Sequence, residues 1–455
     1  MFRRLLIANR GAIARRVVRA CNDLGIESVA VYSEADAHAP YLSEASRAVG
    51  LPGVSAGETY LNTAALLEAV RASGADAVHP GYGFLAENAD FARAVAAAGA
   101  TFVGPDPKWL EVMGDKVAAR RLLADHGFPV FPGSGGLSSL DEALSAAAEL
   151  SYPVLLKPAA GGGGIGMRLV RDEAELARAF ASAQRLAEQA FGQGGIYLER
   201  AIDKPRHVEF QILADGAGGA LHLYERECSI QRRHQKIIEE APAVGLPREE
   251  LDALAARAEA VMAEIGYDNV GTLETLCTQQ GEFGFLEMNA RIQVEHAVTE
   301  AVTGLDLVGL QIRLAAGAAL PERPGLCGHA VEARIYAEDP RTLLPDTGVL
   351  RVFRAPRMHR VRVETGYQEG QAVTPFYDAM LAKVIGWGET RELAIGRTLV
   401  GLKGFEIRGV KTNIPLLLDV LQDDGFLAGL IHTGFLDGLV LGSDLRSGGG
   451  VGRNA

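Results

Sequence analysis

The chain has 455 residues, of which 48% are hydrophobic and 22% are charged, and its net charge is -12. Two or three domains with buried cores are expected, because domains usually contain ~100–200 residues. The acidic balance excludes the protein-wide positive field that attracts nucleic acids or anionic membranes.

The cysteines form no CxxC pair, which disfavours a zinc site or a disulfide framework. The apolar run at the N-terminus is too short for a signal peptide, and no stretch approaches the ~18 apolar residues of a membrane helix. We therefore expect a soluble, cytoplasmic protein that binds neither nucleic acid nor a membrane.

The first hundred residues alternate between short apolar runs and helical patterns, which is typical of a parallel α/β sheet. The expected strands are residues 5–8, 28–32, 77–79 and 101–104, and the expected helices include residues 13–22 and 61–73. The dinucleotide fingerprint GxGxxG does not follow the first strand, so an NAD-binding role is disfavoured.

A helix-rich stretch follows, and then an apolar strand, residues 152–157, runs into a glycine loop. Residues 286–295 alternate between apolar and polar side chains. If this segment is extended throughout, its polar side chains share one face and line a site. These polar residues are Glu287, Asn289, Arg291, Gln293 and Glu295.

The glycine loop places Lys157 before four consecutive glycines, residues 161–164. Backbone N–H groups without side-chain cover can bind phosphate oxygens, and the lysine adds a cation. The pattern is not the P-loop GxxxxGK[ST]. The alternative interpretation is a flexible linker or a turn.

Two further groups have the chemistry of ligand sites. The basic run QRRHQK, residues 231–236, suits phosphate or bicarbonate, although a solvated basic turn is the alternative. Glu274, Glu287 and Asn289 offer the hard oxygen ligands that Mg²⁺ prefers, with simple exposure as the alternative. Arg291 and Gln293 can hold a small anion, and Glu295 is placed to act as a general base.

In order and combination, these motifs resemble the biotin carboxylase family of the ATP-grasp superfamily, over roughly residues 1–440. Besides the glycine loop and the basic run, the matching stretches are IANRG (7–11), HPGYGFLAEN (79–88), MGDK (113–116), PRHVE (205–209), EMNARIQVEHAVT (287–299), VEAR (331–334), PFYDAM (375–380) and GVKTN (409–413).

The resemblance implies an N-terminal parallel α/β (pre-ATP-grasp) domain at residues 1–112 and a central ATP-grasp domain at residues 113–324. The lid of the central domain would span about residues 130–205. A C-terminal mixed α+β biotin carboxylase domain would occupy residues 325–442, followed by a flexible tail, residues 443–455.

The resemblance also implies the ligand sets. Mg²⁺ (or Mn²⁺) would be held by Glu274, Glu287 and Asn289, and bicarbonate by Lys236, Arg291, Gln293 and Val294. Glu295 would remove the bicarbonate proton, and Arg334, with Tyr82 nearby, would bind biotin and stabilise its enolate. ATP would be bound by Lys116, Lys157, Gly163, Gly164, Glu199, Arg200, Ile202, His207, Gln231, His234 and Leu276, together with Glu274 and Glu287.

The implied activity is ATP-dependent carboxylation of biotin on a biotin carboxyl carrier protein, as the first half-reaction of a multi-subunit acyl-CoA carboxylase, with acetyl-CoA as the expected acceptor. The sequence contains no AMKM biotinylation motif, so a separate carrier protein, a separate carboxyltransferase and a homodimer are expected. The alternatives are a module serving a pyruvate or urea transferase, another ATP-grasp ligase, or a degenerate ATP-binding subunit. Ile165, where the family's lid has Lys or Arg, favours the last.

Overall fold

The computed structural model describes residues 1–159, 166–191 and 195–438. Its N-terminal part is a five-stranded parallel sheet in the order β3-β2-β1-β4-β5. The strands are β1 (Arg4–Ile7), β2 (Glu27–Tyr32), β3 (Arg47–Gly50), β4 (Ala77–His79) and β5 (Thr101–Phe102). The helices around it are α1 (Gly11–Leu24), α2 (Pro40–Glu44), α3 (Thr63–Ser73) and α4 (Ala89–Ala97). The predicted parallel α/β architecture is confirmed.

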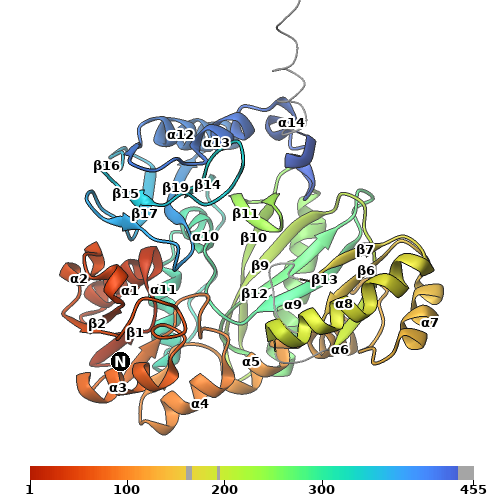
Figure 1. Cartoon of the computed structure of the whole chain (residues 1–455), viewed down its shortest axis with the longest axis horizontal. Coiled ribbons are helices and arrows are strands. Elements are labelled where there is room, and N and C mark those ends of the chain that lie inside the picture. Colours follow the sequence, from red (N-terminus) through yellow and green to blue (C-terminus); the bar gives the residue numbers. More distant parts are fainter. Residues whose placement is uncertain (160–165, 192–194, 439–455) are drawn as a thin grey trace, which may run out of the picture.

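A small three-stranded sheet in the order β7-β6-β8 forms one end of the molecule (Figure 1). Its strands are β6 (Val154–Pro158), β7 (Arg168–Val170) and β8 (Ile196–Arg200), and helices α7 (Leu140–Leu150) and α8 (Glu173–Phe191) pack on it. This unit has its own apolar core, which includes Val154, Leu156 and Leu198. Helices α5 (Pro107–Gly114) and α6 (Lys116–Asp125) connect it to the N-terminal sheet.

The largest sheet has eight strands in the order β13-β12-β9-β10-β11-β14-β19-β17, and its pairs are antiparallel. It runs from the central region into the C-terminal region, because β11 pairs with β14. The strands are β9 (Arg206–Asp215), β10 (Ala220–Arg232), β11 (Gln235–Ala241), β12 (Asp268–Cys277), β13 (Phe283–Asn289), β14 (His329–Tyr336), β17 (Val361–Thr365) and β19 (Met380–Gly388).

Helices complete the central and C-terminal regions. Helix α9 (Arg248–Ile265) packs on β9 and β10, and α10 (His296–Thr303) packs on β10, β11, β14 and β19. The remaining elements are η1 (Glu34–Asp36), α11 (Leu307–Ala315), β15 (Gly348–Val349), β16 (Val352–Arg354), β18 (Ala372–Val373), α12 (Arg391–Lys403), β20 (Glu406–Arg408), α13 (Ile414–Leu421) and α14 (Asp424–Leu427). Within the described ranges, no helix is both long and apolar enough to cross a membrane.

One local prediction is wrong. The segment 286–295 is not extended throughout, because β13 ends at Asn289 and α10 begins at His296. Residues 290–295 form an irregular connection, with Glu295 in the N-cap position of α10. Strand alternation therefore does not place Arg291, Gln293 and Glu295 on one face; the turn into the helix positions them.

Candidate active site

Lys236 lies at the centre of a buried cluster of charges. Its Nζ is 2.6 Å from Glu209 Oε2, 2.9 Å from Glu274 Oε1 and 2.7 Å from Glu295 Oε1. Burial alone would lower the lysine pKa, but the three carboxylates raise it well above its ordinary value. The ammonium group therefore stays charged and connects β9, β11, β12 and the start of α10.

Arg226 completes this cluster from β10 and is fully buried. Its Nε donates to Glu209 Oε1 at 2.5 Å, and its Nη2 donates to Gln293 Oε1 at 2.8 Å. The same guanidinium also donates to the Gln211, Thr272 and Thr299 side chains. We call these residues the charged centre, which comprises Glu209, Arg226, Lys236, Glu274 and Glu295. Sequence reasoning missed Arg226, and it included Glu209 only as the last residue of the PRHVE stretch.

Glu295 is held by two cations. Its Oε1 contacts Lys236, and its Oε2 accepts a hydrogen bond from Arg334 Nη2 at 3.0 Å. Burial would raise the pKa of the Glu295 carboxyl, but Lys236 and Arg334 outweigh it and hold that pKa well below its usual range. Glu295 is therefore ionised at neutral pH, as a proton acceptor must be.

The turn before α10 brings Gln293 to the charged centre and Arg291 to its rim. Gln293 Nε2 donates to Glu274 Oε1 at 2.6 Å. Arg291 Nε donates to Glu87 Oε2 and its Nη2 to Asn289 Oδ1, at 2.8 and 2.5 Å. The Val294 carbonyl accepts a hydrogen bond from Lys383, a buried residue of β19 that no sequence pattern singles out.

The expected metal ligands come together on a pair of antiparallel strands. Glu274 on β12 lies directly opposite Glu287 on β13, and Asn289 Nδ2 donates to Glu274 Oε1 at 2.8 Å. Two carboxylates and one amide group offer the oxygen donors that Mg²⁺ prefers, so the donor chemistry fits this ion. Lys116 Nζ lies 2.8 Å from Glu287 Oε2, so the lysine ammonium neutralises this carboxylate. A divalent cation bound to Glu287 would neutralise it instead.

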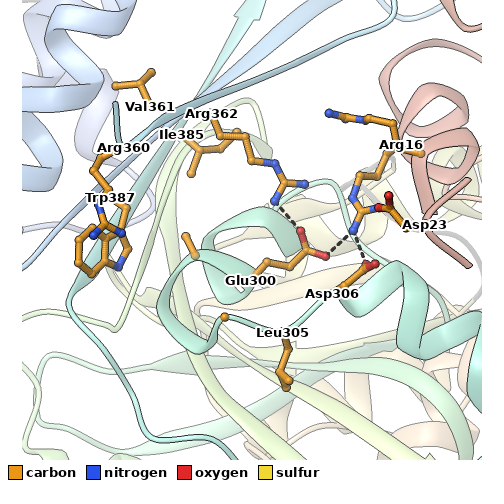
Figure 2. A pocket seen from close by; sticks show the side chains of 13 residues that line it. Arg16, Asp23, Glu300, Leu305, Asp306, Arg360, Val361, Arg362, Ile385 and Trp387 are labelled. Carbon is orange, nitrogen blue, oxygen red and sulfur yellow. Dashed lines mark hydrogen bonds and ion pairs between the residues drawn. The ribbon is translucent and has the colours of Figure 1, made fainter. Parts of the chain in front are cut away.

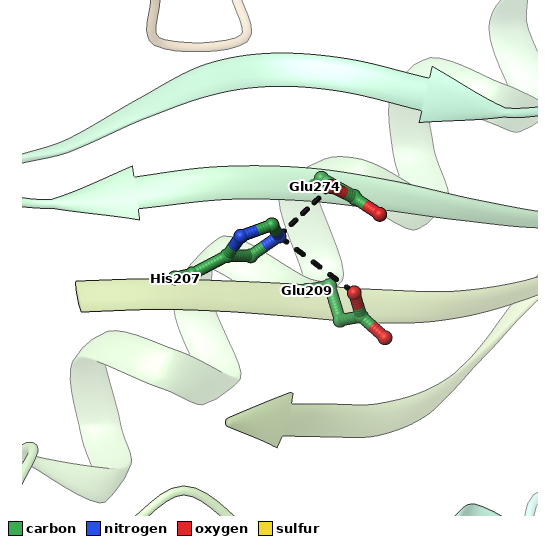
Figure 3. Close-up of side chains that lie close together, drawn as sticks. All are labelled: His207, Glu209 and Glu274. Atoms are coloured by element: carbon green, nitrogen blue, oxygen red, sulfur yellow. Dashed lines mark ion pairs between the residues drawn. The ribbon is translucent and has the colours of Figure 1, made fainter. Parts of the chain in front are cut away.

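His207 adds a nitrogen to this region. Figure 3 shows its ring between Glu209 and Glu274, with Nε2 2.8 Å from Glu274 Oε2 and 3.8 Å from Glu209 Oε2. The three side chains can bring one ligand atom each within 4.8 Å of one another. Gln231 Nε2 lies 2.8 Å from His207 Nδ1, so these two predicted nucleotide residues are adjacent.

Other predicted nucleotide residues surround this edge of the large sheet. Lys157 on β6 forms an ion pair with Glu199 on β8, and Arg120 Nη1 donates to Glu199 Oε1 at 2.8 Å. Arg200 and Ile202 line a cavity of about 310 Å³. Leu276 is half-buried on β12 and His234 is exposed at the turn before β11. Gly163, Gly164 and Ile165 lie outside the described residues.

A second cavity, of about 490 Å³, lies between the N-terminal and C-terminal regions and borders the charged centre. Its lining includes both residues predicted for biotin, Tyr82 and Arg334. Because Arg334 also contacts Glu295, this guanidinium links the charged centre to the cavity. We call this space the interdomain cavity; its lining also includes Arg10, Phe84, Phe376 and Tyr377.

A third cavity, of about 600 Å³, lies on another side of α10 and is rich in arginine (Figure 2). Glu300 accepts from Arg16 at 3.0 Å and from Arg362 at 2.6 Å. Arg19, from the same helix as Arg16, also lines the cavity and is partly exposed. This charged hollow connects α1, α10 and β17 and does not include the charged centre.

Three family models together cover most of the chain. The model described as "Biotin carboxylase, N-terminal domain" matches residues 1–110. "Carbamoyl-phosphate synthase L chain, ATP binding domain" matches residues 115–323, and "Biotin carboxylase C-terminal domain" matches residues 332–438.

Curated relatives and solved structures agree with these models. A biotin carboxylase of Halalkalibacterium halodurans is 48% identical, over 96% of this chain and 97% of the relative. A pyruvate carboxylase subunit of Methanothermobacter thermautotrophicus is 45% identical, over 96% and 90%. The biotin carboxylase domain dimer of Hydrogenobacter thermophilus 2-oxoglutarate carboxylase, a crystal structure with MgADP, ADP and bicarbonate, has a TM-score of 0.94 at 44% identity, over 96% and 98%.

The small three-stranded sheet, the large antiparallel sheet and the matched ATP-binding region define an ATP-grasp enzyme. More narrowly, the chain belongs to the biotin carboxylase family.

Proposed function

We propose that the chain carboxylates biotin on a carrier protein, with ATP and bicarbonate as the other substrates. The observation that carries this proposal is that Arg334 borders both the charged centre and the interdomain cavity. A carboxyl group activated at the charged centre would need to travel only a short way to an acceptor in the interdomain cavity. The Hydrogenobacter thermophilus relative, described with MgADP and bicarbonate, supports the choice of substrates.

In this proposal, Lys236, Arg291, Gln293 and the backbone of Val294 bind bicarbonate. The anion would pair with Lys236, one of the two cations that hold Glu295, so the pKa of that carboxyl would rise and it would become a stronger base. Glu295 then accepts the bicarbonate proton. A bicarbonate oxygen attacks the γ-phosphorus, the bond to ADP breaks, and carboxyphosphate forms.

Lys116, Lys157 and the loop after β6 would bind the nucleotide phosphates, with Glu199, Arg200, Ile202, His207, Gln231, His234 and Leu276 around the rest of the nucleotide. Mg²⁺ or Mn²⁺, held by Glu274, Glu287 and Asn289, would offset the charge that gathers on the transferring phosphoryl group. Exclusion of water from this buried site protects carboxyphosphate from hydrolysis.

Carboxyphosphate would break down to CO₂ and phosphate beside the interdomain cavity. Phosphate takes the ureido N–H proton of biotin, and the nitrogen attacks CO₂. Arg334 stabilises the negative charge on the ureido oxygen, which is an electrostatic role of the oxyanion-hole kind. Tyr82 forms part of the wall of the same cavity.

For the partners, we infer a biotin carrier protein, a separate carboxyltransferase and a homodimer in the cytoplasm. The dimer of the Hydrogenobacter thermophilus relative supports self-association. Acetyl-CoA is the first acceptor to test. Relatives named as subunits of pyruvate carboxylase and of 2-oxoglutarate carboxylase make 2-oxo acids the alternatives.

The test is the rate of ATP hydrolysis with and without bicarbonate, and then with free biotin. Hydrolysis that requires bicarbonate and rises with biotin supports the proposal. Hydrolysis that instead requires an amine would favour another ATP-grasp ligase, and nucleotide binding without turnover would favour a degenerate ATP-binding protein.

A further inference from the structure

Arg10 connects the N-terminal sheet to the C-terminal region at the wall of the interdomain cavity. Its Nε and Nη2 donate to the two carboxylate oxygens of Asp36, each at 2.6 Å. Its guanidinium carbon also lies 4.4 Å from the centre of the Tyr377 ring. One side chain therefore contacts a carboxylate of one region and an aromatic ring of the other.

The Asp36 end of this contact is fixed. Asp36 is buried, and the hydroxyl of the buried Tyr60 donates to Asp36 Oδ2 at 2.6 Å. A two-point arginine–carboxylate contact restricts the orientation of the guanidinium plane as well as its position. The face that Arg10 presents to Tyr377 is consequently set by the N-terminal region.

At the other end of the contact, Tyr377 lies in residues 374–379, which form no helix or strand. Its position therefore depends on side-chain contacts. The Tyr377 hydroxyl donates to the carbonyl of Val54 at 2.5 Å, and its ring packs edge-on against Tyr60 at 5.4 Å. Phe376 and Asp378, on either side of Tyr377, line the same cavity as Arg334. Holding Tyr377 therefore holds this wall of the cavity.

The two regions also touch directly beside Arg10. A Cβ atom added at Gly366 would collide with the backbone of Gly11, the first residue of α1. Gly11 itself lines the interdomain cavity. The backbones thus meet next to the Arg10 contact, at the wall of the cavity.

We propose that Arg10 is a positioning residue for biotin, because it clamps Tyr377 and so fixes the 375–378 wall against Arg334. This inference rests on the proposed carboxylation of biotin and adds a residue that acts through Tyr377. A guanidinium stacked on a ring in a largely buried position contributes enough to change binding of a substrate by roughly tenfold.

The first experiment compares steady-state kinetics of Arg10→Gln with those of the unchanged protein. In the variant, kcat/KM for biotin falls about tenfold more than kcat/KM for ATP, mainly through the KM for biotin. Arg93→Gln is the matched control, since Arg93 is a partly exposed arginine of the same region that pairs with Asp90 and Glu111. Equal losses of both kcat/KM values in Arg10→Gln would overturn the proposal.

The second experiment asks whether Arg10 acts through the ring. Tyr377→Leu removes the ring, and Tyr377→Phe keeps it while losing the contact with Val54. The proposal expects Tyr377→Leu to raise the KM for biotin, Tyr377→Phe to raise it less, and the Arg10→Gln/Tyr377→Leu double variant to add little. Additive effects of the two single variants would overturn it.

A failure of the proposed function is recognised separately. If the unchanged protein shows no stimulation by biotin, the carboxylation proposal fails and the Arg10 proposal fails with it. If the unchanged protein is stimulated and Arg10→Gln has the same KM for biotin, the Arg10 proposal alone fails. Thermal melting of each variant excludes unfolding as the cause of a kinetic change.

Discussion

The charged centre and the interdomain cavity lie side by side but are constructed differently. In the charged centre, Glu209, Arg226, Lys236 and Glu274 all project from strands of one sheet, and Glu295 joins them from the start of α10. The cavity is lined by residues of separate regions of the chain, including the start of α1, the 375–378 segment and Arg334 on β14. The geometry of the charged centre therefore depends on the balance of charges within one sheet. The geometry of the interdomain cavity depends on how the N-terminal and C-terminal regions pack against each other.

The largest expected effect is in the charged centre. Glu295→Gln keeps the shape of the side chain but removes the proton acceptor. Bicarbonate-dependent ATP hydrolysis should fall by about 10³-fold, within the range typical of a lost general base. ATP binding, measured by calorimetry, should persist. Loss of ATP binding in this variant would mean that the role of Glu295 is misassigned.

The next largest effect concerns stability. Arg226→Leu should lower the free energy of unfolding by about 3 kcal/mol, because it leaves Glu209 with one fewer cation and Gln293 without a donor in a fully buried position. Urea denaturation measures this change. Arg93→Gln, whose ion pairs are exposed, should change it by less than about 1 kcal/mol. Similar decreases in the free energy of unfolding in both variants would show that the buried contacts of Arg226 contribute no more to stability than exposed ion pairs do.

A pair of carboxylates behind Arg334 should make stability depend on pH. Glu239 and Glu332 are opposite each other on β11 and β14, and both are fully buried. Burial raises the pKa of Glu239 to about 8 and that of Glu332 to about 7, although nearby cations oppose it. The charged groups that act on this pair are Lys236, Glu295, Arg334, Glu364 and Lys383.

The sign follows from proton uptake. Between pH ~4.5 and the raised pKa values, the folded protein holds protons that the unfolded chain has released, so stability falls as pH rises from ~4.5 and levels off above about 7 to 8. Glu332→Gln should flatten this fall by about 2 kcal/mol, since one pKa unit corresponds to ~1.4 kcal/mol. Urea midpoints at pH 5.5 and 8.5 measure it. Glu68→Gln, on the exposed face of α3, is the control, and an equal slope in both variants would refute the assignment.

The smallest effect concerns the metal. Glu287→Gln should raise the half-saturating concentration of Mg²⁺ about tenfold, equivalent to ~1.4 kcal/mol, because one anionic oxygen ligand is lost while Glu274 and Asn289 remain. Titration of ATP hydrolysis with Mg²⁺ at fixed ATP measures this. An unchanged Mg²⁺ dependence would remove Glu287 from the ligand set.

Local strand patterns in the sequence predict part of the charged centre and the metal site. Period-two alternation correctly puts Glu287 and Asn289 on one face of β13, and its carboxylate chemistry makes Glu274 a candidate metal ligand. The prediction of one extended strand through Glu295 is wrong because the chain turns after Asn289 and enters α10. The residues still converge, since the turn returns Gln293 and Glu295 to Lys236 and Glu274.

Contacts between distant segments cannot be predicted from the sequence pattern. Arg226 and Lys383 look like ordinary strand residues until the register of the sheet is known, and that register puts Lys383 beside Arg334. Arg10 stands out in the sequence only as part of the IANRG motif. Its contacts with Asp36 and Tyr377 join residues far apart along the chain, and no local pattern encodes them.

The most direct test of the account is transfer of radiolabelled carboxyl from bicarbonate to free biotin by the purified chain with Mg²⁺ and ATP. Acid-labile label should appear on biotin, require ATP and disappear in Glu295→Gln. ATP hydrolysis that proceeds equally without bicarbonate, with no label on biotin, would contradict it.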